Sequence, residues 1–475
     1  MRGERRLAGA KPAASEPPSQ VGLDQLAGVA RANRRWLYAG RALRSGSTAF
    51  LTVVFPLYLA AEGYSSTRVG LVLTVGGFIS AVVVLGVGLG GDRFGRRTML
   101  IVVSALGVLG GVALVASTNL VVVMLANGLC GIGRGGGAGG GGAYGPLFPA
   151  EQPLLAASSD DRSRTAAFAR LSFIGVAAGA LGSMISWVPE VLHGAGWTWS
   201  AGYRAVFAIG AALSVLLVVV ALPIREHRPH LAAKPDEAPQ LAGSHQAGGG
   251  PKLSTRQLVG RLATVNTLNG FGYGFLGALL AYWFHVRYGV GPGAIGVLYT
   301  IVNLATMAPY LYSARLTRRL GSVRTVVSTR GIGLLFLLAM VWTPTFVLAG
   351  AAYAMRIVIS SLGMPARQSY LMGVADERRR SSIAAVGSLP SQLSSSVSPI
   401  VGGALMESFV NVPILGAFVF MSANTVGYYL SFRHYRPPEE RTGPLPTAEA
   451  NALAGRFGAR CQGSGGPTGR GWGAG

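Results

Sequence analysis

Residues 149–167 read PAEQPLLAASSDDRSRTAA, and residues 365–385 read PARQSYLMGVADERRRSSIAA. The second stretch repeats the first in a constant register, and each copy lies between two long apolar runs. The clearest matched pairs are Pro149/Pro365, Gln152/Gln368, Asp160/Asp376, Arg162/Arg378 and Arg164/Arg380. A segment repeated between the helices of a hydrophobic chain indicates two homologous membrane-embedded halves.

The composition supports a membrane protein. Of the residues, 50% are hydrophobic and only 12% are charged, whereas soluble domains carry about 25% charged residues. The net charge of +23 does not indicate a nucleic-acid partner, because the sequence contains no soluble domain with interleaved basic and aromatic residues. The spacing of the two cysteines, Cys130 and Cys461, predicts neither a disulfide nor a metal site.

A helix that spans a bilayer needs about 20 apolar residues. Twelve stretches of the sequence meet this requirement, and we predict an all-α membrane protein with twelve transmembrane helices in two six-helix halves. The predicted spans are 36–61, 67–90, 98–117, 119–147, 165–188, 204–224, 257–284, 294–312, 325–343, 346–364, 383–406 and 412–432.

The spans define the expected domain organisation. The halves are residues 36–224 and 257–432, joined by a polar linker at 225–256, with a basic tail at 1–35 and a disordered tail at 433–475. With the N-terminus inside, most arginines of the short loops fall on the inner side, as the positive-inside rule requires. We therefore expect a monomer in a bacterial-type plasma membrane with both termini in the cytoplasm.

One connection between predicted helices carries a specific motif. Residues 88–97 read GLGGDRFGRR, between the second and third spans. We expect Gly88 to allow close helix packing, Gly95 to form the tight turn, and Asp92 to cap a neighbouring helix. Arg93, Arg96 and Arg97 should face the cytoplasm and its anionic lipids.

This motif resembles the cytoplasmic loop signature of the major facilitator superfamily, Gly-x-x-x-Asp-Arg-x-Gly-Arg-Arg/Lys. The resemblance implies a secondary transporter that works by alternating access, with Asp92 helping to latch the outward-open state. A second copy at 314–321 has Arg318 in place of the aspartate. Residues 398–403, SPIVGG, resemble an element of the family's drug/proton antiporters, although those proteins carry it in the fifth helix rather than the eleventh.

Among the arginines within predicted spans, Arg44, Arg134 and Arg356 are the candidates for an intramembrane functional charge. A charged residue there is costly, so each is expected to be buried and functional; the alternative is a structural arginine bonded to a neighbouring helix. Arg134 loosely matches the family's fourth-helix arginine, and Arg356 is its candidate counterpart in the second half. We expect Arg41 to extend its side chain to the inner surface.

The repeated segments hold the predicted inner gate. In the family architecture they fall in cytoplasmic loops, where their charges are expected to form ion pairs between helices. The residues concerned are Asp160, Arg162, Arg164, Asp376, Glu377, Arg378 and Arg380.

The resemblance also implies a central cavity between the halves, near the bilayer midplane. Aromatic side chains with a few amides suit an amphipathic organic molecule, although ordinary helix packing is the alternative for each residue. The candidates are Thr48, Tyr58, Asn266, Asn269, Tyr273, Tyr282, Trp283, Asn303 and Gln392.

Three functions remain open. The first hypothesis is proton-linked efflux of hydrophobic or drug-like compounds, but no Asp or Glu lies in the middle of a predicted span to carry the proton. The second is transport of an anionic solute paired with Arg44, Arg134 or Arg356. The third is a non-transporting membrane sensor or assembly factor. No constellation for an enzyme, cofactor or metal is visible, and the glycine run 135–142 lacks the strand that a dinucleotide site requires.

Overall fold

The computed structural model describes residues 20–132, 145–159, 161–226, 255–309, 316, 319–363 and 380–432. These residues form helices and short connections, and no strand occurs among them. Seven of the helices are long and apolar enough to cross a membrane, and three shorter apolar helices accompany them. The prediction of an all-α membrane fold is therefore confirmed, whereas the count of twelve spans and the boundaries of the halves stay predictions.

The first set of helices packs around α1. Side chains cap several of them in the way their sequences predict: Ser65 caps α2, Asn119 caps α4 and Thr198 caps α8. The elements are α1 (Gln20–Ala61), α2 (Ser66–Phe94), α3 (Arg96–Ala116), α4 (Leu120–Cys130), α5 (Phe148–Ala157), α6 (Asp161–Ser183), η1 (Met184–Trp187), α7 (Val188–Gly194) and α8 (Trp199–Ala221).

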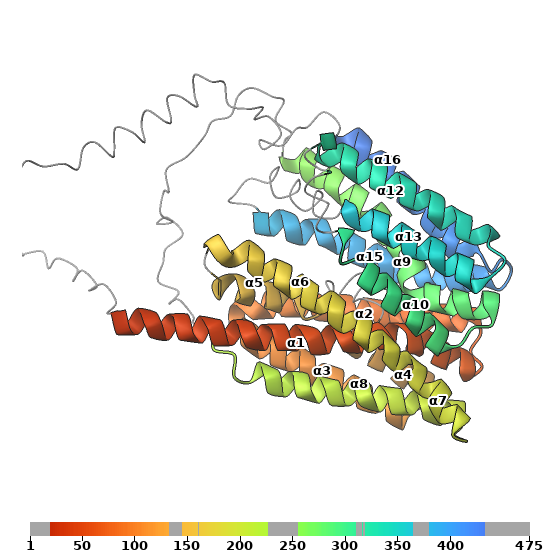
Figure 1. Cartoon of the computed structure of the whole chain (residues 1–475), viewed down its shortest axis with the longest axis horizontal. Helices are drawn as coiled ribbons and strands as arrows, with labels where there is room; N and C mark the ends of the chain where they lie inside the picture. The colour runs from red at the N-terminus through yellow and green to blue at the C-terminus, as the bar shows by residue number, and fades with distance from the viewer. Residues whose placement is uncertain are drawn as a thin grey trace, which may run out of the picture.

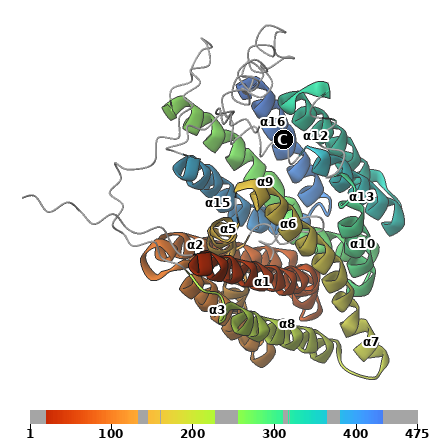
Figure 2. The same ribbon diagram turned by 60° about the vertical axis from the view of Figure 1, so that its left-hand side comes forward.

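The second set packs around α9. Pro292 occupies the first turn of α10, where its missing N–H costs nothing, and Thr345 caps α13. The elements are α9 (Thr255–Tyr288), α10 (Pro292–Ala305), α12 (Ser322–Ala339), η2 (Met340–Trp342), α13 (Phe346–Leu362), α15 (Arg380–Met406) and α16 (Val412–Phe432). Figures 1 and 2 show the two sets lying beside each other.

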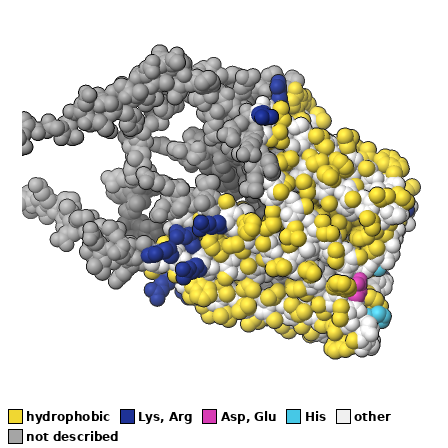
Figure 3. Space-filling model, in the orientation of Figure 1, with side chains coloured by type: hydrophobic (Ala, Val, Ile, Leu, Met, Phe, Trp, Pro, Cys, Tyr) yellow, Lys and Arg dark blue, Asp and Glu magenta, His cyan; other side chains and the backbone are white. Residues whose placement is uncertain are grey.

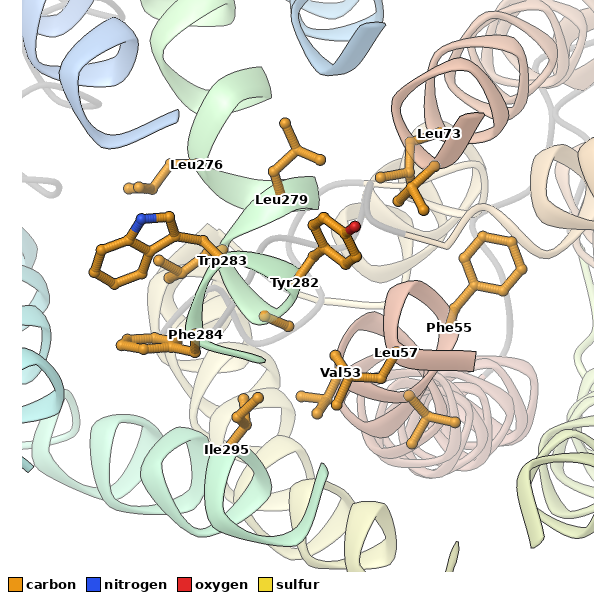
Figure 4. Close-up of a cluster of buried hydrophobic side chains, with 14 of the residues drawn as sticks. Val53, Phe55, Leu57, Leu73, Leu276, Leu279, Tyr282, Trp283, Phe284 and Ile295 are labelled. Carbon is orange, nitrogen blue, oxygen red and sulfur yellow. The ribbon is translucent and has the colours of Figure 1, made fainter. Parts of the chain in front are cut away.

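A single aromatic-rich core joins the two sets. Phe55 and Tyr58 of α1, Trp283 and Phe284 of α9, and Tyr299 of α10 are almost completely buried in it. Figure 4 shows Phe55 and Tyr282 contributed to this cluster by ribbons of the two different sets. The surface is equally apolar: Leu89, Leu181 and Val347 are each more than 70% exposed, and hydrophobic side chains cover most of the face in Figure 3. Lipid is the solvent that such a surface fits.

The structure corrects the sequence prediction around the first repeated segment. The predicted span 119–147 is not one helix, because α4 ends at Cys130, where Gly131 adopts a left-handed conformation with φ of 63°. The expected loop beginning at 149 is instead helical from Phe148 to Ala157. Pro149 lies in the opening turn, where its missing N–H costs no helical hydrogen bond, whereas Pro153 lies inside the helix and removes one such bond. The predicted basic tail at 1–35 is also helical from Gln20 onward, as the first part of α1.

Candidate functional site

A buried cluster of charge lies between α1 and α5. Arg41 and Arg44 are three residues apart on α1 and therefore share one face of that helix. Both guanidinium groups contact the same oxygen, Oε2 of Glu151, at 3.1 Å from Arg41 Nη1 and 2.9 Å from Arg44 Nη2. The side chains of Arg41, Arg44 and Glu151 are only 3%, 10% and 5% exposed. The cluster carries a formal charge of one positive unit.

The prediction that Arg41 reaches the inner surface is wrong. Its side chain is held inside the bundle because α5 places Glu151 within hydrogen-bond distance. Removing a carboxylate from water costs several kcal/mol, and charge-assisted hydrogen bonds to two arginines offset that cost. Sequence reasoning assigned no role to Glu151. The available signal was an acidic residue in an otherwise apolar stretch, opposite two arginines spaced by one helical turn.

Two clefts lie beside this cluster. The first is lined by Arg44 and by apolar and small residues of α1, α3, α4 and α8, and it has a volume of about 70 Å³. The second runs past Trp36, Arg41 and Glu151. A site for a drug-sized molecule needs roughly 300–1,000 Å³, so the first cleft has room only for a few waters. Of the predicted cavity residues, Thr48 lines the first cleft and none lines the second.

Arg356 is a second buried cation, near the middle of α13. It is 5% exposed, and its Nη2 donates to the thioether of Met421 at 3.2 Å. A thioether is a weak acceptor. The electrostatic neighbours of the guanidinium group are the hydroxyls of Tyr273 and Tyr353. Within the part of the chain that the structure describes, Arg356 forms no ion pair.

The other predicted cavity residues do not converge on one site among the described residues. Tyr58 and Trp283 belong to the core: the Tyr58 ring lies edge-on to Phe207, and Trp283 Nε1 donates to Asn411 Oδ1 at 3.2 Å. The hydroxyl of Tyr282 bonds that of Ser66 at 2.9 Å. Asn269 and Asn303 are buried, Asn266 and Gln392 are half-buried, and Tyr273 is 44% exposed. Tyr273 is the member of this set that interacts electrostatically with Arg356.

The glycine-rich motif forms the turn between α2 and α3. Gly95 has φ of 97°, which favours glycine over any residue with a side chain. The backbone N–H groups of Arg96 and Arg97 donate to the Glu226 carboxylate at 3.0 and 3.1 Å, so Glu226 caps α3. Arg93 is exposed and lies over the ring of Phe94.

Two expectations for this motif meet different outcomes. The packing role of Gly88 is wrong, because this glycine is exposed and a Cβ added to it would meet no atom within 4 Å. Gly90 makes the close approach instead, since a Cβ added to it would lie 2.9 Å from Met99 Sδ. The capping role predicted for Asp92 concerns a side chain outside the described residues.

The predicted inner gate and one predicted arginine also lie outside the described residues or side chains. They are Arg134, Asp160, Arg162, Arg164, Asp376, Glu377, Arg378 and Arg380. Among the residues that are described, no group of three His, Cys, Asp or Glu side chains is arranged to hold a metal.

Comparison with known proteins agrees with this architecture. The family model described as Major Facilitator Superfamily matches residues 37–363 and 262–464. A bacterial homolog of the human lysosomal transporter Spinster, in an inward-facing and unoccupied conformation, aligns with a TM-score of 0.61 and 15% identity, covering 88% of this chain and 99% of that one. The nucleoside transporter NupG aligns with a TM-score of 0.59 and 12% identity over 86% of this chain and 99% of its own.

A human protein is similar at the same level. The organic anion transporter MFSD10 aligns with a TM-score of 0.52 and 15% identity, covering 85% of this chain and 99% of that one. At these identities the likeness concerns the fold alone. A comparison with curated protein sequences gives no match.

Proposed function

Because the chain belongs to the Major Facilitator Superfamily, it is a secondary transporter of small solutes, and we propose that its solute is an organic anion bound at Arg356. The solute would cross the membrane by alternating access, as one helix set rocks against the other. The proposal deepens the second of the three hypotheses that the sequence left open.

The observation that carries the proposal is the incomplete compensation of Arg356. A buried guanidinium group loses its hydration, and the loss is offset only by an anion or by strong acceptors. Among the described residues its hydrogen-bond acceptor is the sulfur of Met421. Arg41 and Arg44, in contrast, share the carboxylate of Glu151. A carboxylate or sulfonate on a solute would give Arg356 what Glu151 gives the first cluster, and the partly exposed Tyr273 would contact its organic part.

Proton-linked efflux of hydrophobic compounds has weaker support. It requires a carboxylate or histidine that exchanges a proton within the membrane. Glu151 is the buried carboxylate of the described residues, and protonating it would leave two buried arginines without their shared partner. Coupling at Glu151 would therefore be opposed by the same ion pairs that hold the cluster together.

We also propose the orientation and the location. The described arginines near the start of α1, Arg31, Arg34 and Arg35, are joined at that end by Arg93 and Arg225, and Figure 3 shows the basic side chains gathered there. The positive-inside rule supports placing this end in the cytoplasm of a plasma membrane. Asp92 as a conformational latch and the ion pairs of the inner gate belong to the same proposal, and charge reversal at Asp160 and Arg162 that leaves transport intact would remove the gate from it.

Ligand binding tests the solute class directly. We would measure the melting temperature of the purified protein with benzoate, benzenesulfonate and the neutral isostere benzamide. We expect saturable stabilisation by the two anions and not by benzamide. Arg356→Met should weaken anion binding by at least about 30-fold, because truncating one partner of a buried charge pair costs about 2–5 kcal/mol.

Arg330→Met is the matched control. Arg330 lies in the adjacent helix α12 and donates to Asn424, so its replacement removes a similar charge from the same set of helices. Equal anion affinity in Arg356→Met and wild type would refute the proposed site. In proteoliposomes, flux of a neutral dye that is driven by a pH gradient and unchanged by Arg356→Met would favour proton-linked efflux. The absence of flux for every compound tested would favour a sensor.

A further inference from the structure

The two helix sets meet along two seams at the end of the bundle opposite the basic end, which we term the predicted outer end. One seam joins the start of α2 to the end of α15, and the other joins the start of α10 to α6, η1 and α7. In each seam, one set contributes the beginning of a helix, α2 or α10. The other set contributes the end of a long helix, α15 or α6, or the short helices that follow it. The seams are therefore contacts between the sets, not within them.

A carboxylate closes each seam at its outermost level. In the first, Glu407 accepts hydrogen bonds from the backbone N–H of Thr67 at 3.2 Å and from its hydroxyl at 2.7 Å. In the second, Glu190 accepts a hydrogen bond from the backbone N–H of Gly293 at 3.0 Å. Thr67 and Gly293 are both the second residue of their helices. Each carboxylate thus sits at the partially positive N-terminus of a helix that belongs to the other set.

Direct backbone contact forms the next level of each seam. A Cβ added to Gly70 would lie 3.1 Å from Ile400 Cα and would overlap the carbonyl oxygen of Pro399. A Cβ added to Gly296 would lie 2.9 Å from Ser186 Cβ and would overlap the carbonyl oxygen of Ser183. Any larger residue at Gly70 or Gly296 would force the helices apart.

A threonine completes each seam at the third level. Thr74 Oγ1 accepts a hydrogen bond from the backbone N–H of Ile400 at 2.9 Å. Thr300 Oγ1 donates to the carbonyl oxygen of Ala180 at 3.0 Å. Both hydroxyls therefore bond the backbone of the opposite set.

The three levels repeat in sequence as well as in space. Residues 66–74 read STRVGLVLT and residues 292–300 read PGAIGVLYT. In this register Thr67 matches Gly293, Gly70 matches Gly296 and Thr74 matches Thr300. The carboxylates match too, since Glu190 and Glu407 each follow the long helix that faces the seam. The two seams are therefore pseudo-symmetric copies of one interface. The first set supplies the helix start in one seam, and the second set supplies it in the other.

We propose that these two seams are the outer gate of the transporter and that Glu190 and Glu407 are its paired latches. The proposal rests on alternating access, because a gate must open when the sets separate. Opening breaks the hydrogen bonds between the carboxylates and the two helix N-termini, and water replaces them. Because Glu407 is exposed and Glu190 is only half-buried in the closed form, the latches favour that form by only about a few-fold each. A weak latch of this kind holds a gate without trapping it.

Distance measurements between spin labels test the gate without any solute. Thr118 and Pro344 are exposed residues of different sets at the predicted outer end, and cysteines placed there in a Cys130→Ala/Cys461→Ala background would carry the labels. Loss of one carboxylate, in Glu190→Ala or Glu407→Ala, should raise the ratio of open to closed populations about two- to five-fold. The double variant should raise it by roughly the product of the two.

Glu62→Ala is the matched control, because Glu62 lies at the same end but bonds Ser200 at 2.6 Å within its own set. Gly296→Leu provides a second variant, which should lengthen the distance even if the closed form dominates strongly. Unchanged distances in both the double variant and Gly296→Leu would overturn the gate. Opening by Gly296→Leu with no effect of the double variant, or an equal effect of Glu62→Ala, would overturn the latch role.

Anion binding is scored separately on the same monodisperse samples. Failure of benzoate to bind, with a gate that still opens as expected, would remove the proposed solute and leave the gate intact. If the gate variants have no effect but benzoate binding still depends on Arg356, the proposed gate is removed and the proposed solute class stands.

Discussion

Replacing Glu151 by Gln is expected to destabilise the protein by about 3–5 kcal/mol, the usual cost of breaking a buried ion pair by removing one partner. The structure supports a value in this range, because one carboxylate oxygen receives two charge-assisted hydrogen bonds at 3.1 and 2.9 Å. Each such bond contributes about 1.5–3 kcal/mol. The amide would leave two guanidinium groups buried with no negative charge between them.

Equilibrium unfolding in mixed detergent micelles measures this change. Glu62→Gln is the control, since Glu62 is only half-buried and bonds a hydroxyl rather than arginines. The triple variant Arg41→Met/Arg44→Met/Glu151→Leu should recover most of the lost stability, because apolar residues of similar volume replace buried ion pairs at little cost. A loss below about 1 kcal/mol for Glu151→Gln, or a triple variant less stable than the single one, would show that the cluster is not held by its charges.

Three further predictions concern the ends of the bundle. Gly95→Ala should destabilise the fold by about 1–2 kcal/mol, because the φ of Gly95 is 97°. Gly88→Ala, at an exposed position inside α2, should stabilise the fold by about 0.5–1 kcal/mol. If both variants changed the free energy of unfolding in the same direction, the roles given to these two glycines would be contradicted. Glu226→Ala should lower the free energy of unfolding by about 1 kcal/mol in the same assay, because α3 loses its cap. It should leave the transport rate at saturating solute concentration unchanged. Hydrogen bonds from the Thr67 side chain and backbone, and from the Ser65 hydroxyl, lower the pKa of Glu407 below its usual 4.5. The Glu407 latch is therefore complete at neutral pH and is lost as the pH falls through that lowered pKa; label distances between pH 7 and 3 should show this step in wild type and not in Glu407→Gln.

Much of the architecture was predictable because the solvent is so restrictive. In hydrocarbon every backbone N–H and C=O needs a partner, so a long apolar run has the helix as its low-energy solution. The turn at Gly95 was also predictable, since positive φ is a local property of the residue. The helix break at Gly131 was not, because glycine is frequent in membrane helices and gains meaning only from its neighbours.

The charged sites depended on distant contacts. Arg41 and Glu151 are 110 residues apart in the chain, and either one alone is compatible with a side chain reaching toward water. Arg356 was identified as an intramembrane charge, but only packing revealed that its described acceptor is Met421. The aromatic residues Tyr58 and Trp283 satisfied the same compositional criterion as a cavity wall and proved to be core, because composition does not tell which face of a helix meets its neighbour.

The sequence by itself therefore determined the membrane environment, the all-α class, the family and the existence of a repeat, all of which follow from local hydropathy and short motifs. Tertiary structure alone decided which repeated positions meet. Residues 66–74 and 292–300 carry one pattern, yet neither carboxylate that completes it lies nearby in the chain. Glu190 and Glu407 reach the helix ends of the opposite set only after both sets have packed, because a latch between halves is a property of their arrangement.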